Sequence, residues 1–336
     1  MREMSSIKIS VIIPTHSRVH YLRNCLYSLE RQVYDKNLFE VIVINDGSTD
    51  DTRQTLEDFK KNTEINFNFI NQENKGVSFS RNVGIDNVRG EYIAFTDDDC
   101  IVPEDWLLRM HHDFVSVDET VAGIGGPLNC FALNEKLYAS RFIQFLDEFN
   151  YIPVARKFII FQTHISKLRG DEQIPYLRTS NAIFRKKCLK EVGGFDINFK
   201  RAGGEDPDLC YRLLNLNYQF FFDKNLVVLH HTRESIFSYF KSFKNYMEGE
   251  VRKNKKSHLY SNKVVRRSYQ YLIPRKIIIA FIFCCLYPLS VLGMWRQKKY
   301  PLFDVISFPF IVTASKFLAL AFSAFYHIKY LKAAKS

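Results

Sequence analysis

The chain contains 336 residues, with 47 lysines and arginines against 36 aspartates and glutamates, and carries a formal net charge of +11. This length accommodates one large core and an appendage. Its seven cysteines are odd in number and show no CxxC pairing, which argues against a disulfide framework or a structural zinc site. Residues 1–7 lack an apolar signal segment, so we expect the folded part to stay on the cytoplasmic side.

The first third alternates apolar β-branched runs with helical patterns. Residues 7–13 and 39–44 read as strands, and residues 66–70 read as a weaker third strand. We expect Pro14 to stop the first of them. Between them, apolar residues recur at helical spacing over residues 22–29. This order predicts an α/β fold with a doubly wound, mostly parallel sheet.

Polar residues follow the first two of these strands, at Pro14-Thr15 and Asn45-Asp46, and Asp97–Asp99 follows a further apolar strand-like run at residues 93–96. The carboxyl ends of parallel strands meet at one edge of the sheet, so we expect these residues to line one crevice. Neighbouring carboxylates repel one another unless a cation lies between them. Mg²⁺ or Mn²⁺ suits such a site and commonly also binds substrate phosphates. A solvated acidic loop is the alternative.

Four segments carry a family resemblance, and they follow one another over about the first hundred residues. They are Ser10–His16 (SVIIPTH), Val43–Asp50 (VINDGSTD), Asn74–Gly84 (NKGVSFSRNVG) and Gly90–Asp99 (GEYIAFTDDD). In order and spacing they closely resemble the motifs of family-2 inverting glycosyltransferases with the GT-A fold. The resemblance extends more loosely to GGFD at 193–196 and GEDPDL at 204–209, and so covers residues 6–235.

The resemblance implies a donor site for a nucleotide sugar. Pro14 and Thr15 would lie under the nucleotide, and Asp46 would accept a hydrogen bond from a ring N–H of uracil or guanine. Arg81 and Lys75 would contact the ribose or the phosphates.

The resemblance also implies a metal site. Asp97 would meet the ribose side of the donor and is also a candidate metal ligand, while Asp99 would coordinate the Mn²⁺ or Mg²⁺ that bridges the diphosphate. Cys100 stands where the family often has a further acidic residue.

Acceptor activation requires a base, and Glu205-Asp206 supplies the candidates. Acidic residues at the start of a helix, with a proline in its first turn, also serve as ordinary N-terminal caps. The resemblance favours the catalytic interpretation, with Asp206 as the general base and Glu205 as a supporting or acceptor-side residue.

Two further pairs of residues lie near the expected crevice. His230-His231 follows an apolar strand-like run, and because side chains alternate along a strand only one imidazole can face the site. We expect His231 to be a metal ligand, although the pattern leaves the choice between the two open. Arg178 and Asn181 precede another short apolar run and are candidates for the acceptor edge.

The C-terminal part changes character. Nine lysines and arginines and no acidic residue lie within residues 252–276, and the uncharged apolar stretch Ile277–Trp295 follows directly. A polybasic flank beside an apolar run is typical of a membrane boundary, which argues against nucleic acid as the partner, although a buried core helix is the alternative. Residues 305–327 form a second apolar stretch that contains Lys316. We expect one or two membrane-associated helices here.

These observations predict a catalytic domain over residues 1–250, with a nucleotide-binding half at 6–127 and an acceptor half at 128–250, and a membrane-associated region at 251–336. The expected function is metal-dependent inverting transfer of one sugar from a UDP- or GDP-sugar to a hydroxyl of a saccharide or lipid-linked glycan, at the cytoplasmic side of the cell membrane. Transfer to a polyprenyl phosphate is one alternative, and a non-enzymatic membrane-surface binding module is another.

Overall fold

The structure is a computed structural model of the whole chain. It describes residues 7–131, 138, 141–142, 176–231, 235–256 and 301–308, together with residues 310, 311, 314 and 321. The chain divides into two compact units, residues 1–129 with 165–230, and residues 130–164 with 231–336.

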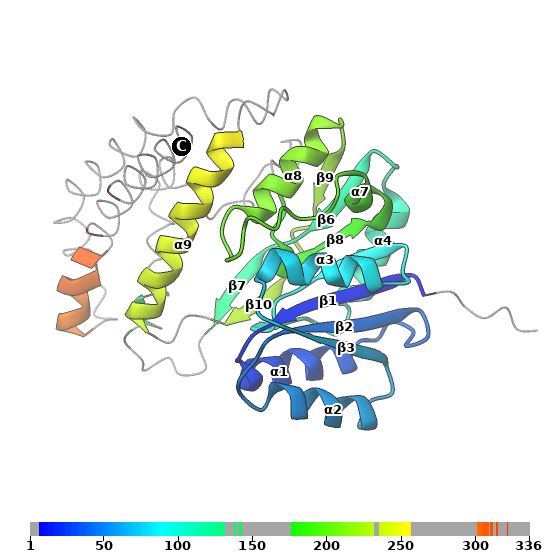
Figure 1. The fold of residues 1–336 in the computed structure, drawn as a ribbon, viewed down its shortest axis with the longest axis horizontal. Coiled ribbons are helices and arrows are strands. Elements are labelled where there is room, and N and C mark those ends of the chain that lie inside the picture. Colours follow the sequence, from blue (N-terminus) through cyan, green and yellow to red (C-terminus); the bar gives the residue numbers. More distant parts are fainter. Residues whose placement is uncertain are drawn as a thin grey trace, which may run out of the picture. The chain divides into compact units, whose positions relative to one another are not determined.

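The first unit is built on a seven-stranded sheet, which confirms the predicted α/β class (Figure 1). The strand order is β3-β2-β1-β4-β8-β6-β9, and only β8 runs antiparallel to its neighbours. The bounds are β1 (Ile9–Thr15), β2 (Phe39–Asp46), β3 (Asn66–Gln72), β4 (Tyr92–Phe95), β6 (Val121–Gly125), β8 (Ala182–Arg185) and β9 (Gln219–Phe222).

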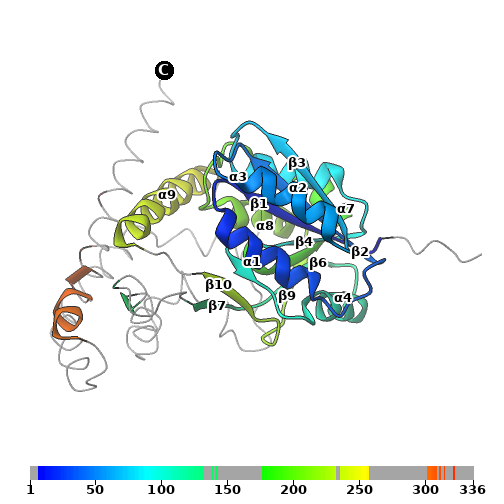
Figure 2. The same ribbon diagram turned by 90° about the horizontal axis from the view of Figure 1, so that it is seen from below.

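Helices cover both faces of this sheet, as its buried strands require (Figures 1 and 2). They are α1 (Val19–Glu30), α2 (Thr52–Asn62), α3 (Val77–Asn87), α4 (Trp106–Ser116), α7 (Lys186–Glu191) and α8 (Glu205–Asn215). The helical pattern expected over residues 22–29 is confirmed, because Leu22, Cys25, Leu26 and Leu29 are the apolar residues that α1 buries.

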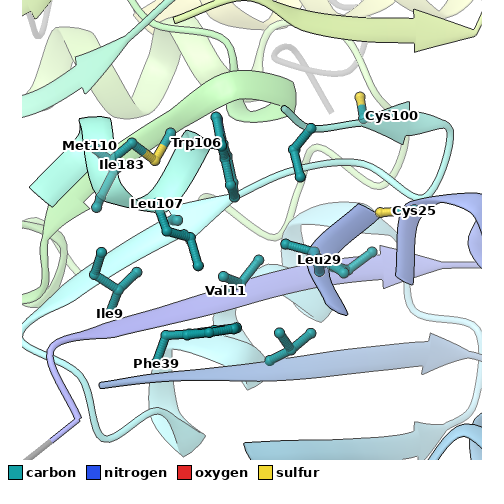
Figure 3. Close-up of a cluster of buried hydrophobic side chains, with 14 of the residues drawn as sticks. Ile9, Val11, Cys25, Leu29, Phe39, Cys100, Trp106, Leu107, Met110 and Ile183 are labelled. Atoms are coloured by element: carbon teal, nitrogen blue, oxygen red, sulfur yellow. The ribbon is translucent and has the colours of Figure 1, made fainter. Parts of the chain in front are cut away.

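One core fills the space between the sheet and helices α1 and α4. Figure 3 shows Ile9 and Val11 of β1 and Phe39 of β2 with Leu29 of α1 and Trp106 of α4 in this cluster. The opposite face of β1 packs on α3, where a Cβ on Gly84 would lie 2.6 Å from a methyl group of Ile12. This close approach fixes α3, which carries Arg81, against the strands that end at the site.

Strand β1 continues through Pro14 to Thr15, so the expectation that Pro14 ends the strand was wrong. Pro14 pairs with Ile44 of β2, whereas β4 on the other side ends with Phe95 opposite Ile12. Pro14 therefore lies beyond the end of β4, where a missing N–H interrupts no ladder on that side.

A second sheet has the order β5-β10-β7. Its strands are β5 (Cys100–Ile101), β10 (Val228–His231) and β7 (Leu128–Phe131). Strand β10 pairs antiparallel with β5, with His230 opposite Cys100. This pairing brings a histidine to the acidic segment that follows β4.

The second unit contains the helix α9 (Ile236–Lys255), and residues 302–308 are also helical. Within this unit the buried carboxylate of Asp304 pairs with Arg141 at 2.5 Å, and the Tyr138 hydroxyl donates to Ser307 Oγ at 2.7 Å. The predicted domain boundary at 250/251 falls inside α9.

Within the described ranges, no helix has both the length and the apolar character to cross a membrane. The stretch Ile277–Trp295, on which the membrane prediction mainly rests, lies outside those ranges, as does most of residues 305–327.

Candidate active site

The end of β1 and the acidic segment after β4 meet, as the strand pattern predicts. Thr15 Oγ1 donates a hydrogen bond of 2.7 Å to Asp98 Oδ2. The side chain of Asp98 is fully buried, and burial raises its pKa from 3.8 to about 7 against the opposing charge of Arg18. The middle carboxylate of the three therefore anchors the loop instead of facing the crevice.

Arg18, just before α1, is a site residue that the sequence reasoning missed. Its guanidinium pairs with Asp98 Oδ1 and lies 2.6 Å from Asp99 Oδ2. Burial alone would lower the pKa of Arg18, but the charges of Asp98, Asp99 and Asp97 outweigh it and raise the pKa. Arg18 thus supplies a fixed positive charge between two of the three carboxylates.

Asp97 faces away from Arg18. Its Oδ1 accepts a hydrogen bond from Arg81 Nη2 at 3.1 Å, and its Oδ2 accepts one from Ser180 Oγ at 2.6 Å. The side chain of Asp97 is 22% exposed, so one edge remains accessible. Asp97 thus joins α3 to the segment before β8.

Arg81 is buried among carboxylates. We expected it at the ribose or the phosphates, but within the described ranges its polar contacts are with these carboxylates. Besides Asp97, its Nη1 lies 3.1 Å from Glu205 Oε1 and 3.5 Å from Asp206 Oδ1. Its guanidinium carbon lies 5.4 Å from the centre of the Phe195 ring. Burial lowers the pKa of Arg81, but the charges of Asp206, Asp97 and Glu205 outweigh that effect and raise it. One guanidinium therefore balances three carboxylates from two distant motifs.

The two acidic residues that open α8 bind groups outside the helix. Gly204, with φ of 93°, is the N-cap residue and makes no side-chain capping bond. Asp206 accepts from Thr179 Oγ1 at 2.8 Å and from Thr179 N at 3.2 Å, and Glu205 Oε2 accepts from Gly203 N at 2.6 Å. These contacts favour the interpretation of Glu205-Asp206 as site residues over that of simple helix caps.

Burial shapes the protonation of both groups. Burial, with the charge of Asp206, raises the pKa of Glu205 from 4.5 to about 7, and burial raises the pKa of Asp206 although Arg81 and Thr179 favour its charged form. A carboxylate with a raised pKa is a stronger base at neutral pH, which suits proton abstraction.

The raised pKa of Glu205 predicts a pH dependence of stability. Because the folded state holds this proton more tightly than the unfolded chain, the contribution of Glu205 is fully present below about pH 4.5 and is lost as pH rises through about 7. We expect the wild type to lose stability relative to Glu205→Gln as pH rises across this window. Urea unfolding at several pH values in EDTA measures the difference, and the exposed Glu57→Gln is the control. A difference that stays constant with pH would contradict the assignment.

Asp46 orders the loop that follows β3. Its Oδ1 accepts from Gln72 Nε2 and from Lys75 N at 2.7 and 2.9 Å, and its Oδ2 accepts from Gly76 N at 2.9 Å. Gly76 has φ of 95°, and a Cβ there would lie 2.2 Å from Lys200 O, so only glycine fits. The predicted contact of Asp46 with the base stays a prediction. The Lys75 ammonium lies over the Phe79 ring, 4.9 Å from its centre.

The histidine beside the acidic segment is His230, whereas we expected His231 to be the metal ligand. His230 Nε2 lies 3.4 Å from Asp99 Oδ1, because β10 places His230 opposite Cys100. His231 points to the other side of the strand, and its ring meets that of Phe131 edge-on at 4.9 Å. Asp97, which we also expected at the metal, is turned toward Arg81 and Ser180 instead.

Asp99, Cys100 and His230 could together hold a metal ion, since their ligand atoms lie within 4.8 Å of one another. Burial raises the pKa of the Cys100 thiol well above its usual value, which leaves it protonated and a poor ligand. Carboxylate oxygen and imidazole nitrogen remain, and this pair fits Mn²⁺ better than Mg²⁺.

Asn181, which we expected at the acceptor edge, is buried and bonded to neighbouring segments, and its contact with the acceptor stays a prediction. Asn181 is 1% exposed, accepts from Trp106 Nε1 at 2.9 Å, and donates to the carbonyls of Leu226 and Pro127 at 2.7 and 3.1 Å. These bonds use both hydrogens of its amide group. Arg178 lies half-buried just before the short 3₁₀ turn at Thr179–Asn181.

The site thus gathers the end of β1, the segment after β4, the 3₁₀ turn and the start of α8. The family model for glycosyl transferase family 2 matches residues 10–193 of the chain, which include the first three of these. The chain belongs to glycosyl transferase family 2. This finding confirms the predicted family and the prediction of an enzyme, and it argues against the non-enzymatic alternative.

Curated relatives of the chain are also named as glycosyltransferases. The chain is 36% identical to the glycosyltransferase GlyA of Streptococcus pneumoniae over 128 residues, which cover 38% of the chain and 17% of GlyA. It is 28% identical to the glycosyltransferase YfnE of Bacillus subtilis over 264 residues, which cover 68% of the chain and 66% of YfnE. The chain thus spans less than two thirds of the length of these relatives.

Solved structures show the same fold. The mannosyltransferase PcManGT of Pyrobaculum calidifontis, in complex with GDP-Man and Mn²⁺, superposes with a TM-score of 0.61 at 17% identity, over 94% of the chain and 87% of PcManGT. TarS 1–349 of S. aureus, in complex with UDP-GlcNAc, superposes with a TM-score of 0.54 at 18% identity, over 88% of the chain and 76% of the TarS 1–349 chain. At these identities the likeness establishes a GT-A-like fold with a mostly parallel sheet.

Proposed function

We propose that this glycosyltransferase moves one sugar from a UDP- or GDP-sugar to a hydroxyl of a saccharide or lipid-linked glycan, with inversion at the anomeric carbon. The observation that carries the proposal is the position of Asp206, which shares Arg81 with the donor-side residue Asp97. The structural neighbours bound to GDP-Man and UDP-GlcNAc support nucleotide sugars as donors.

Inversion follows from a single displacement. Asp206 takes the proton of the acceptor hydroxyl, and the oxygen forms a bond to the anomeric carbon as the bond from that carbon to the diphosphate breaks. Thr179 holds the carboxylate of Asp206 in one orientation, and the raised pKa of Asp206 favours proton uptake. A polyprenyl phosphate is already ionised and needs no base, so Asp206 favours a hydroxyl acceptor.

The donor lies along the ends of β1 and β2 in this proposal. Thr15 supports the acidic segment through Asp98, and Asp46 holds the loop that carries Lys75, next to the expected place of the base. Arg81 is a positioning residue, because its buried guanidinium fixes the position of Asp97 and Asp206 relative to each other.

Asp99 and His230 would hold the Mn²⁺. When bound, the ion neutralises charge on the departing diphosphate. Arg18 already lies on Asp99 Oδ2, so the side of that carboxylate nearer His230 is the one we assign to the ion.

The test of the proposed function is a donor screen. Release of nucleoside diphosphate is measured with UDP-, GDP- and CDP-sugars and Mn²⁺, and the anomeric configuration of the product is read by NMR. Inversion with a UDP- or GDP-sugar is the expected result. Retention of configuration would overturn the role of Asp206.

A prediction for the metal site is that Asp99→Asn weakens Mn²⁺ binding by at least about tenfold, since the ion loses its charged ligand. Isothermal titration calorimetry of the full chain without donor measures this directly. Asp105→Asn removes a partly exposed carboxylate just before α4 and serves as the control. Equal Mn²⁺ affinity in wild type and Asp99→Asn would refute the assignment.

We further propose that residues 251–336 attach the enzyme to the cytoplasmic face of the cell membrane, on the strength of the polybasic run and the apolar stretch Ile277–Trp295. The full chain should then sediment with membranes and resist a high-salt wash. Recovery in the soluble fraction at low salt would contradict attachment.

A further inference from the structure

A cavity of about 500 Å³ lies at the other end of the strands from the active site. Its walls come from the residues that precede β1, β4 and β6 and from the end of β8 with the helix α7. β1 is seven residues long, so about 20 Å of extended chain separates Lys8 at this cavity from Thr15 at the site.

The cavity is strongly basic. Two glutamates, Glu91 and Glu119, face six cationic side chains, which are Lys8, Arg89, Arg185, Lys186, Lys187 and Lys190. We call this set the basic cavity.

Two of the six cations form ion pairs, and Arg185 is held by backbone carbonyls. Lys187 pairs with Glu119 at 2.5 Å, and Arg89 pairs with Glu40 at 2.8 Å. Arg185 is 8% exposed and donates to the carbonyls of Val121 and Asp118. The Arg185 guanidinium also lies over the rings of Tyr92 and Phe114, and it forms no ion pair within the described ranges, although the charges of Asp118 and Glu119 act on it.

The other three cations, Lys8, Lys186 and Lys190, form no ion pair with any residue in the described ranges. Lys186 Nζ donates to Val88 O at 2.6 Å, which fixes it at the wall. Burial and the charge of Lys190 lower the pKa of Lys186, a sign that the positive charges here repel one another. An anion in the cavity would relieve this repulsion.

We propose that the basic cavity binds a ligand that carries a diphosphate or polyphosphate group. The three lysines without an ion pair and the buried Arg185, less the negative charge of Glu91, leave a positive excess of roughly three charges, which matches pyrophosphate, and lysine ammonium groups bind phosphate as compact point charges. The volume also admits a larger molecule around the phosphates. The group can belong to a free ligand or to a lipid headgroup.

The test uses the full chain in EDTA, so that no metal supports diphosphate in the donor site. Calorimetry with inorganic pyrophosphate compares the wild type with Lys8→Gln/Lys190→Gln. We expect the dissociation constant to rise about tenfold or more in the double variant, because two charged contacts are lost. Lys36→Gln/Lys61→Gln carries the same change in net charge on exposed lysines elsewhere and should bind as the wild type does.

Arg18→Gln distinguishes the two sites. If this active-site variant weakens pyrophosphate binding and the double variant does not, the anion occupies the donor site and the proposal fails. Equal dissociation constants in all the proteins also overturn it. Lys190→Gln alone, an exposed change, gives a second measurement should the double variant fold poorly.

Phosphatidylcholine vesicles with and without diacylglycerol pyrophosphate, a lipid whose headgroup is a diphosphate, identify the source of the group. Weaker binding of the double variant only to the vesicles that contain the lipid diphosphate assigns a lipid headgroup, whereas weaker pyrophosphate binding with unchanged vesicle binding assigns a free ligand. Sugar transfer is measured on the same proteins, so failure of this proposal is distinct from failure of the proposed function.

Discussion

Asp206→Asn is expected to lower kcat by about 10²–10⁴-fold and to leave donor affinity nearly unchanged. Asparagine keeps the shape of the side chain and the 2.8 Å bond from Thr179 Oγ1, but it cannot take a proton from the acceptor. The loss therefore falls on the chemical step. Single-turnover kinetics with calorimetry of nucleoside diphosphate binding separates the two effects.

Asp118→Asn is a matched control for this change. The carboxylate of Asp118 likewise accepts from the backbone N–H and the hydroxyl of one threonine, Thr120, but it lies exposed at the surface. Its replacement should leave kcat within about twofold. If Asp206→Asn abolished donor binding instead, Asp206 would be a donor-side or structural residue and another base would be required.

Arg81→Met is expected to lower the free energy of unfolding by about 3–5 kcal/mol and to abolish activity. The substitution removes the guanidinium that balances Asp97, Glu205 and Asp206, and leaves carboxylates without a counter-charge in a buried site. Arg81→Lys keeps the charge but loses the fork that reaches both motifs, so we expect an intermediate loss.

Urea unfolding measures these losses. Arg53→Met is the control, because Arg53 is 72% exposed and, within the described ranges, forms an ion pair only with Glu57 on its own helix. That change should cost less than about 1 kcal/mol. An Arg81→Met protein as stable as the wild type would show that the three carboxylates are protonated or solvated, and that Arg81 does not hold the site together.

The local pattern of apolar residues was sufficient to predict the central strands of the sheet. The runs at residues 7–13 and 39–44 are β-branched and apolar because both faces of β1 and β2 are covered, and strands of this kind are visible in one sequence. The convergence of Thr15 with the acidic segment then follows from the parallel order.

Contacts between distant segments could not be predicted in this way. The partners of Arg81 are set by how α8 returns to the sheet, 124 residues later, and no local pattern records that path. The choice of His230 over His231 depends on the register of β10 against β5, in which a shift of one residue would reverse it. Arg18 reads as an ordinary polar loop residue until its neighbours are known.

The position of β8 bears on how the chain folds during synthesis. Strands β3, β2, β1 and β4 can pair as soon as residue 95 is made, but β4 keeps an open edge until β8 arrives between it and β6. The roughly 90 residues that separate Phe95 from Arg185 take about 5–18 s to translate. During that interval one edge of the apolar strand Tyr92–Phe95 is open to pairing with other nascent chains, and chaperones that shield this edge would raise the yield of folded enzyme.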